Sequence, residues 1–303
     1  MEEKVNQHIH IGTGKFGLGF VGYFSHQFGF STVFLNRKPR TESSAKRNSK
    51  LRDEKSYTIE YYDRNGEKNP IKFHDLHFFG RGLEETGSSV GFISDPRTIL
   101  LTTAVGESQL QHIAPLIADG LQRRKETSPL FIIACENGHR CSQKLSEEVR
   151  KYLPSHKHGG IFADCVVDQI CQDIKPLDDE TNQSQNHVTV IAESYRQWVI
   201  EDVDERLTKL LNHKSIKFVP KSHIDLYELR KLWLVNGFQL ATAVLGYRYR
   251  IGEISKVIVS THPKLAQHIE GIKTELANAF IFKNQGIFTP EEVDTYIDRK
   301  SVV

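Results

Sequence analysis

Three glycines near the N-terminus, Gly12, Gly14 and Gly17, have the spacing G-x-G-x-x-G. A short apolar stretch at residues 9–11 precedes them, and aromatic residues three and four positions apart follow them, as in a helix. A glycine turn between a strand and a helix can bind a pyrophosphate, because the backbone comes close and the helix N-terminus offers free N–H groups. We therefore predict a dinucleotide-binding turn; the alternative is a glycine-rich turn without a ligand. The residues predicted to bind are Gly12, Thr13, Gly14, Lys15, Phe16 and Gly17.

The residues after the second predicted strand (32–35) bear on the choice of cofactor. Asn36 stands 19 residues after Gly17, where sites for the non-phosphorylated cofactor place an acidic residue on the ribose 2′-hydroxyl. An amide does not repel a 2′-phosphate, and the next residue, Arg37, can pair with one bidentately. We predict NAD or NADP as cofactor, with NADP tolerated or preferred. The alternative is that Arg37 and Lys38 are ordinary surface charges.

Strands and helices alternate over the first 200 residues. Polar residues 41–55 predict a loop or surface helix, and residues 57–62 with 71–79 predict a hairpin inserted after the second strand. Continuous apolar runs at 98–105 and 129–135 predict buried parallel strands, each followed by a helix, at 109–122 and up to about 153. Residues 162–170 and 187–193 predict further strands. The pattern indicates an α/β fold with a Rossmann-type doubly wound parallel sheet over residues 1–200.

From about residue 200 the pattern becomes helical, which predicts a second, substrate-binding domain over residues 201–303. Residues 226–245 are apolar nearly all round and predict a buried helix, and residues 263–282 predict another. Thr289 is the predicted N-cap of a third helix, with Glu292 three positions later. Few helices are present to cover 226–245, so we expect an exposed apolar patch and possible self-association.

Composition excludes several classes of function. Lys and Arg number 40 against 38 Asp and Glu, a net charge of +2, which gives no electrostatic reason to bind nucleic acid or an anionic membrane. The charged N-terminus lacks the apolar core of a signal peptide, and no apolar run approaches the ~18 residues of a membrane span. Four cysteines match no usual zinc spacing. We expect a cytoplasmic protein with buried, reduced thiols and no metal.

Four stretches resemble the mannitol dehydrogenase family of polyol-specific long-chain dehydrogenases, in particular its mannitol-1-phosphate branch. They are IGTGKFGLGF at 11–20, LLTTAVGESQLQHIAPLIADGLQRRKE at 100–126, PLFIIACEN at 129–137 and KLWLVNGFQLATAVLGY at 231–247. The resemblance implies a Rossmann domain followed by a helical domain that continues beyond residue 303 in relatives. It also implies metal-free hydride transfer between a nicotinamide dinucleotide and a polyol phosphate, of the mannitol 1-phosphate and fructose 6-phosphate type.

The family motif Lys-x4-Asn-x2-His reads Lys231, Asn236 and Gln239 in this chain. The resemblance implies that Lys231, with a pKa lowered by desolvation, is the general base. Asn236 would donate a hydrogen bond to the substrate oxygen as it gains charge. In an α-helix Asn236 lies about 140° and Gln239 about 80° round from Lys231, so all three can face one cleft. Gln239 stands where the family has histidine, and glutamine cannot carry a proton.

The resemblance implies further site residues in the first domain. Asp168 and Asn137 would lie near the substrate and the nicotinamide, and Thr103, Ala104 and Val105 would contact the cofactor. Asp168 lies in VDQICQ, where the family's arginine and proline are absent. Two alternatives stay open. One is a dinucleotide-binding relative with little or no activity, and the other is a relative that acts on a uronate or a free hexitol.

Overall fold

The computed structural model describes residues 5–36, 41–63, 67–74, 76–79, 86–125, 129–154, 160–175, 187–258 and 262–298. The chain divides into two compact units, Met1–Ile224 and Asp225–Val303. The predicted boundary at residue 200 lies 24 residues before this division. The difference arises because a helix and a strand after residue 200, α6 (Glu205–Leu210) and β13 (Ile216–Val219), belong to the first unit.

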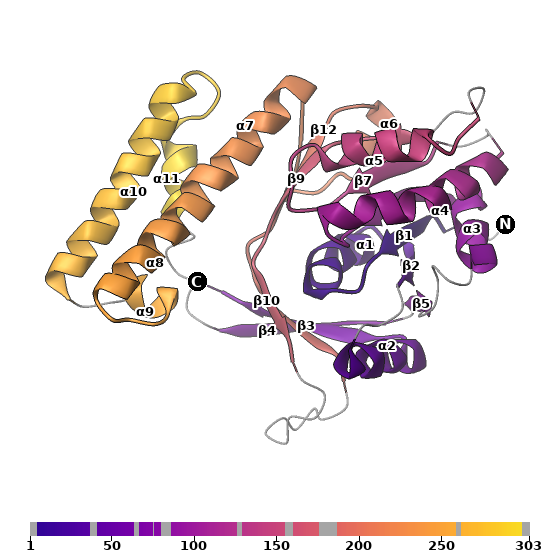
Figure 1. Cartoon of the computed structure of the whole chain (residues 1–303), viewed down its shortest axis with the longest axis horizontal. Helices are drawn as coiled ribbons and strands as arrows, with labels where there is room; N and C mark the ends of the chain where they lie inside the picture. The colour runs from indigo at the N-terminus through magenta and orange to yellow at the C-terminus, as the bar shows by residue number, and fades with distance from the viewer. Residues whose placement is uncertain are drawn as a thin grey trace. The chain divides into compact units, whose positions relative to one another are not determined.

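A six-stranded sheet forms the centre of the first unit (Figure 1). Its order is β5 (His77–Phe79), β2 (Ser31–Leu35), β1 (Gln7–Ile11), β6 (Thr98–Thr103), β7 (Phe131–Ala134) and β8 (Ile161–Phe162). Every pair is parallel, which confirms the predicted doubly wound sheet. The strand order reverses between β1 and β6, and ligands of such sheets bind at this switch point, beyond the carboxyl ends of the strands.

Three helices cover one face of this sheet: α3 (Thr86–Ser94), α4 (Leu110–Arg123) and α5 (Cys141–Arg150). Their inward residues, such as Ile117 and Leu145, pack on Ile9 and Leu101 in one fully buried cluster. The helices predicted after 98–105 and 129–135 are therefore confirmed. All four cysteines of the chain are buried, and none of them forms a disulfide.

The opposite face is covered by the helix that follows the glycine turn and by a three-stranded sheet. The helix comprises η1 (Gly17–Val21) and α1 (Gly22–Gln27), and the sheet has the order β13, β12 (Gln197–Glu201) and β9 (Cys165–Asp168). Phe20 and Phe24 pack on Trp198 between them. The single strand predicted at 162–170 is thus wrong. Only β8 joins the parallel sheet, and β9 turns away to pair antiparallel with β12.

A second sheet packs beside this helix, in the order β10 (Cys171–Ile174), β11 (Thr189–Glu193), β3 (Tyr57–Tyr62) and β4 (Lys68–Phe73). The predicted hairpin is confirmed as far as Phe73. It is wrong beyond that residue, because β5 leaves the hairpin and joins the parallel sheet beside β2. The strand predicted at 187–193 also lies in this second sheet, parallel to β3. The predicted surface helix is α2 (Glu42–Glu54).

The segment η1 is a π-helix, and the second sheet explains it. The Tyr57 hydroxyl donates to the Leu18 carbonyl at 2.8 Å. This carbonyl lies where the regular pattern of α-helical hydrogen bonds is interrupted, and the tyrosine supplies a donor for it. A Cβ added to Gly22 would lie 2.0 Å from the Tyr57 Oη. Glycine at position 22 therefore lets the tyrosine reach the helix, a contact that the sequence pattern did not predict.

The second unit is helical. After α7 (Lys221–Lys231), which begins in the first unit, come η3 (Leu232–Gly237), α8 (Phe238–Arg248), α9 (Ile254–Ile258), α10 (Pro263–Lys283) and α11 (Pro290–Asp298). The predicted cap of the last helix is confirmed. The Glu292 backbone N–H donates to the Thr289 hydroxyl at 3.1 Å, and the Thr289 N–H donates to the Glu292 carboxylate at 3.0 Å.

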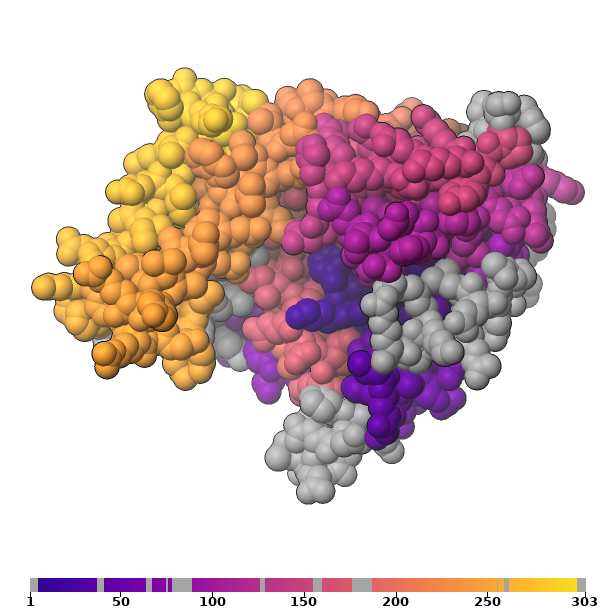
Figure 2. All heavy atoms as spheres, viewed as in Figure 1, coloured from indigo at the N-terminus to yellow at the C-terminus, as the bar shows by residue number. Residues whose placement is uncertain are grey.

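The predicted burial of residues 226–245 on all sides is wrong. Leu240 is 68% exposed and Val244 is 62% exposed, and Tyr247 on the same helix is 89% exposed. An apolar face of α8 is therefore exposed, as predicted; the atoms of this unit are orange to yellow in Figure 2. Self-association through this face stays a prediction.

Candidate functional site

The glycine turn joins β1 to the helix at the switch point of the sheet. Gly12 has φ +123°, a value that favours glycine, and a Cβ there would lie 2.5 Å from the Ala104 carbonyl oxygen. A Cβ on Gly17 would lie 2.5 Å from the His10 Nε2. Apart from its two chain neighbours, no described residue has an atom within 4 Å of the Cβ position of Gly14. The first and third glycines are thus needed by the fold, whereas the second lies beside open space that can admit a ligand.

Gly14→Ala is expected to separate folding from ligand binding. The added methyl group meets no protein atom, so the melting temperature should be unchanged. The methyl group would occupy the space that lets a pyrophosphate approach the backbone. We expect dinucleotide affinity to fall at least tenfold, about 1.4 kcal/mol, by fluorescence titration with NADH and NADPH. Gly91→Ala, also in open space, is the matched control, and equal binding by the two variants would contradict this assignment.

Asn36 follows β2 and is buried at 3% exposure. Its Oδ1 accepts from the Thr13 hydroxyl at 2.5 Å, and the same hydroxyl lies 3.3 Å from the Asn48 Oδ1 on α2. The Asn36 Nδ2 has no hydrogen-bond partner among the residues that the structure describes. An unpaired buried amide is costly, and a ribose or phosphate oxygen would satisfy it. Thr13 and Asn36 are therefore brought together at the carboxyl edge of the sheet, while Arg37 lies outside the described residues.

Arg47, which precedes Asn48 on α2, was not predicted as a site residue from the sequence. The Arg47 Nε is buried without a hydrogen-bond partner in the described ranges, and desolvation lowers the pKa of this guanidinium. No ion pair joins Arg47 to the part of the chain that the structure describes. In the sequence, Arg47 is one basic residue in the polar helix after β2. Polar helices commonly carry basic residues, so the pattern alone could not identify Arg47 as a site residue.

Lys15 and Phe16 use their side chains within the protein. The Lys15 ammonium donates to the Gln172 carbonyl at 2.7 Å, and Phe16 stacks on Phe20 with 4.9 Å between ring centroids. These contacts attach the first turn of the helix to the second sheet and to the aromatic core. A role of either residue towards a cofactor stays a prediction and would rest on the backbone of the turn.

Glu136 shapes the loop after β6, which contains the predicted residues Thr103, Ala104 and Val105. Its Oε1 accepts from the Thr103 hydroxyl at 2.7 Å and from the Val105 backbone N–H at 2.9 Å. Its Oε2 accepts from the Gly106 N–H at 2.7 Å. One buried carboxylate thus fixes the loop next to the glycine turn. Its neighbour Asn137 is exposed, and sequence reasoning missed Glu136 because its partners come from another strand.

Two buried histidines on β1 lie beneath the glycine turn. The Thr102 hydroxyl bridges the His8 Nε2 and the His10 Nδ1, each at 2.7 Å, and the His8 Nδ1 bonds to Ser25. Desolvation lowers the pKa of His10 to about 3 and lowers that of His8 as well. Both rings are therefore neutral near pH 7, and the hydroxyl bridge accommodates them inside the sheet.

These histidines make the fold sensitive to acid. The unfolded chain binds protons on each histidine near pH 6.5, whereas folded His10 does not until about pH 3. Between these values the unfolded state holds more protons, so stability falls as pH falls. At pH 5 the loss for His10 alone is about 2 kcal/mol. Urea unfolding at pH 7 and pH 5 measures it, and His10→Gln should reduce the difference. A difference unchanged in that variant would contradict the assignment.

Asp168 ends β9 and is 3% exposed. Its Cα is paired with Gln197 of β12, so the two side chains leave the same face of the three-stranded sheet. Val167 and Trp198 point to the opposite face, into the aromatic core. Asp168 thus belongs to a sheet other than the one that carries the glycine turn.

Lys231, Asn236 and Gln239 lie together on one continuous helical stretch of the second unit. Lys231 is the last residue of α7, and Asn236 lies in η3, which is a π-helix. In a π-helix the hydrogen bonds span five residues, so residues five apart share a face as residues four apart do in an α-helix. The predicted 140° between Lys231 and Asn236 is therefore wrong. The two side chains lie closer to one face, and Gln239 follows three positions later on α8.

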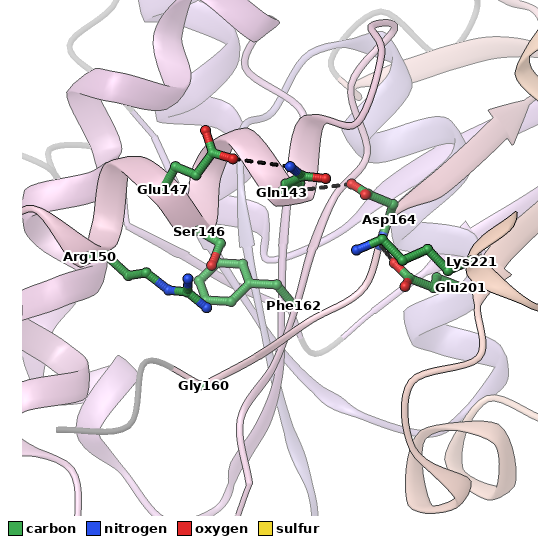
Figure 3. Close-up of a pocket in the computed structure, with 9 residues that line it drawn as sticks. All are labelled: Gln143, Ser146, Glu147, Arg150, Gly160, Phe162, Asp164, Glu201 and Lys221. Atoms are coloured by element: carbon green, nitrogen blue, oxygen red, sulfur yellow. Dashed lines mark hydrogen bonds between the residues drawn. The ribbon is translucent and has the colours of Figure 1, made fainter. Parts of the chain in front are cut away.

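The cavity in Figure 3 has a volume of about 320 Å³ and runs along α5 beside β8. Its lining carries both signs of charge: Glu147, Arg150, Asp164, Glu201 and Lys221. The Asp164 carboxylate accepts the backbone N–H groups of Ser142 and Gln143, each at 3.0 Å. It thereby satisfies the first turn of α5. The buried carboxylate of this cavity therefore has a structural partner, and the glycine turn does not line the cavity.

No helix in the described ranges is long and apolar enough to cross a membrane. The chain matches the mannitol dehydrogenase Rossmann domain over residues 6–211. It is 30% identical to a mannitol-1-phosphate 5-dehydrogenase of Emericella nidulans, over 96% of this chain and 70% of the relative. It is 28% identical to the Bacillus subtilis protein of that name, over 96% and 72%.

Solved structures share the fold. Mannitol 2-dehydrogenase of Pseudomonas fluorescens, in a ternary complex with NAD and D-mannitol, superposes with a TM-score of 0.72 at 15% identity, over 99% of this chain and 69% of that one. A substrate-free D-sorbitol dehydrogenase superposes with a TM-score of 0.75 at 13% identity, over 99% and 70%. The family match spans more than half of the sequence and includes the glycine turn described above. The chain therefore belongs to the mannitol dehydrogenase family.

Proposed function

We propose that this protein is an oxidoreductase that transfers hydride between a nicotinamide dinucleotide and a hexitol phosphate. The observation that carries the proposal is the similarity to mannitol-1-phosphate 5-dehydrogenases over 96% of the chain. The open space at Gly14 and the unpaired Nδ2 of Asn36 support it, because both fit a dinucleotide. The nicotinamide would supply the hydride acceptor. The residues of the chain would bind the dinucleotide and take up the proton of the substrate hydroxyl.

The second unit supplies the proton chemistry in this proposal. Lys231, as the free amine, takes the proton of the substrate hydroxyl while the carbon gives up its hydride. Asn236 donates a hydrogen bond to the oxygen as its charge grows. The shared face created by η3 supports this pairing. Asp168 and Asn137 are proposed on the substrate side of the first unit, and no metal takes part.

A coupled assay tests the function directly. Purified protein with NADH or NADPH should oxidise the cofactor when fructose 6-phosphate is added, and product analysis should find a hexitol phosphate. Fructose and a uronate are the comparison substrates. Faster turnover of either would replace the hexitol phosphate by that substrate class. Cofactor binding without turnover of any of the three would favour the alternative of a dinucleotide-binding relative with little activity.

The preferred cofactor is proposed to be NADP. The support is that the residue after β2 is an amide, Asn36, whose Nδ2 has no partner among the described residues. No acidic side chain in those ranges forms a hydrogen bond with Thr13, Asn36 or Asn48. Arg37 would pair with the 2′-phosphate. Titration with both reduced cofactors decides this point. Tenfold tighter binding of NADH than of NADPH would contradict it.

Gln239→His is expected to raise kcat on hexitol phosphates, because it restores a group that can orient the hydroxyl and carry a proton. Positioned acid–base groups contribute ~10²–10⁴-fold, and recovery of part of this is expected. Dinucleotide affinity should stay nearly the same, because position 239 is proposed on the substrate side of the site. Steady-state kinetics on both proteins measures the change. A fall in kcat would mean that Gln239 is adapted to hydrogen-bond another substrate.

A further inference from the structure

Arg196, in the connection between β11 and β12, is held against two tyrosine rings. Its Cζ lies 3.7 Å from the centroid of the Tyr23 ring and 4.1 Å from that of the Tyr61 ring. The two rings are nearly perpendicular to one another, at 85°, so they contact the guanidinium from two directions and restrict its movement. They leave its N–H groups without acceptors. No hydrogen bond or ion pair joins Arg196 to any residue that the structure describes, and its Nε is buried without a partner.

His213 lies on the same aromatic group, in the loop between α6 and β13. Its ring packs edge-on against Tyr23 and Phe24, with centroids 6.2 Å and 5.4 Å apart. Its Nδ1 accepts the Ser215 backbone N–H at 3.0 Å, so the neutral ring carries its proton on Nε2, as a second donor. Desolvation, together with the positive charges of Lys214 and Arg196, lowers the pKa of His213. Arg196 and His213 therefore both contact Tyr23, and Lys214 follows His213 in the chain.

The position of this group separates it from the predicted reaction site. Trp198 packs on Phe24, the neighbour of Tyr23. Arg196 precedes Trp198 by two residues, and its side chain lies on that same aromatic side. Gln197, between them, is paired with Asp168, and these two side chains leave the opposite face. Tyr23 also lies six residues past Gly17, about 9 Å further along the helix.

We propose that Arg196, His213 and Lys214 form a second anion-binding site, for a phosphate monoester, on the side of the three-stranded sheet opposite Asp168. The fixed guanidinium offers two parallel donors, which match phosphate oxygens better than a flexible ammonium does. Lys214 is exposed and adds charge at the rim, and the His213 Nε2–H adds a neutral donor. The site does not depend on the proposed reaction.

Histidine-labelled protein tests the site by NMR, with the His213 resonance identified from its loss in His213→Gln. Inorganic phosphate and fructose 6-phosphate should each shift this resonance with saturation, at constant ionic strength, whereas fructose should not. Tighter binding of fructose 6-phosphate would identify a sugar phosphate as the ligand, and equal affinities would show that the phosphate group alone is recognised.

Arg196→Gln should weaken phosphate binding at His213 at least tenfold. Arg206→Gln is the matched control, because that guanidinium is already paired with Asp204 at 2.6 Å, and it should bind as the parent does. Should Arg196→Gln melt at low temperature, Lys214→Gln at the exposed rim should still weaken binding about threefold. The proposal is overturned by the lack of a saturable phosphate shift, by an equal response to fructose, or by unchanged binding in a folded Arg196→Gln protein.

Discussion

Lys231→Met is expected to reduce kcat on hexitol phosphate by ~10²–10⁴-fold, the contribution of a positioned acid–base group. Methionine keeps the length and apolar stem of lysine but cannot accept the hydroxyl proton. Both residues are strong helix formers, so α7 should remain intact. Steady-state oxidation of mannitol 1-phosphate, with the melting temperature measured in parallel, gives the result.

Lys264→Met, on the first turn of α10, is the matched control for this experiment. That lysine is exposed, and its variant should turn over as the parent does. Dinucleotide binding should be equal in all three proteins, because Lys231 is proposed to act on the substrate hydroxyl and the glycine turn to bind the dinucleotide. A Lys231→Met protein that keeps its activity would place the base elsewhere and remove the proposed mechanism.

Arg124→Met should destabilise the first unit by roughly 4 kcal/mol. Its Nη1 donates to the carbonyls of Ile93 and Asp95 at 3.1 Å and 2.6 Å, and its Nη2 donates to that of Thr98 at 2.6 Å. Arg124 is 6% exposed. Its removal leaves three carbonyls without this donor, and a buried unsatisfied polar group costs about 1–3 kcal/mol. The guanidinium therefore ties the C-terminus of α4 to the segment between α3 and β6.

Thermal and urea unfolding measure this loss, and for a unit of this size it corresponds to about 10 °C. The control is Arg123→Met on the preceding residue, whose guanidinium pairs with Asp119 at the surface and is 61% exposed. Exposed pairs contribute about 0–1 kcal/mol, so the control should melt close to the parent. Equal melting of the two variants would show that the three carbonyls find other donors.

The sequence predicted the elements whose signal is local. The apolar runs of β6 and β7 and the periodicity of α4 are each complete within one segment, and all three appear as expected. The pairing of short strands is not local. β5 has three residues and β8 has two. Strands this short are too brief to show an alternation of apolar and polar residues, so the sequence does not indicate which sheet they join. The path of β9 away from β8 follows from packing on Trp198, a residue more than thirty positions later.

The candidate site shows the same division. The glycine turn could be predicted because its three glycines and their flanking strand and helix lie within one short stretch. The role of Glu136 could not be predicted, because it depends on hydrogen bonds from the backbone N–H groups of Val105 and Gly106, which follow a different strand. Arg196 could not be predicted either, since its two rings come from positions 23 and 61. A π-helix has no composition of its own, so η1 and η3 were expected as regular α-helix.

The π-helical segment η3 has a consequence for how relatives are aligned. Five residues separate Lys231 from Asn236 here, and one π turn brings them to a common face. An uninterrupted α-helix brings residues four apart to a common face. A relative with one residue fewer in this segment would thus present the same pair of side chains. In an alignment, a one-residue gap at 232–235 would therefore reflect a change from π-helical to α-helical hydrogen bonds. The lysine and the asparagine would still share one face. A substitution that turned η3 into α-helix at constant length would swing Asn236 about 100° away from Lys231.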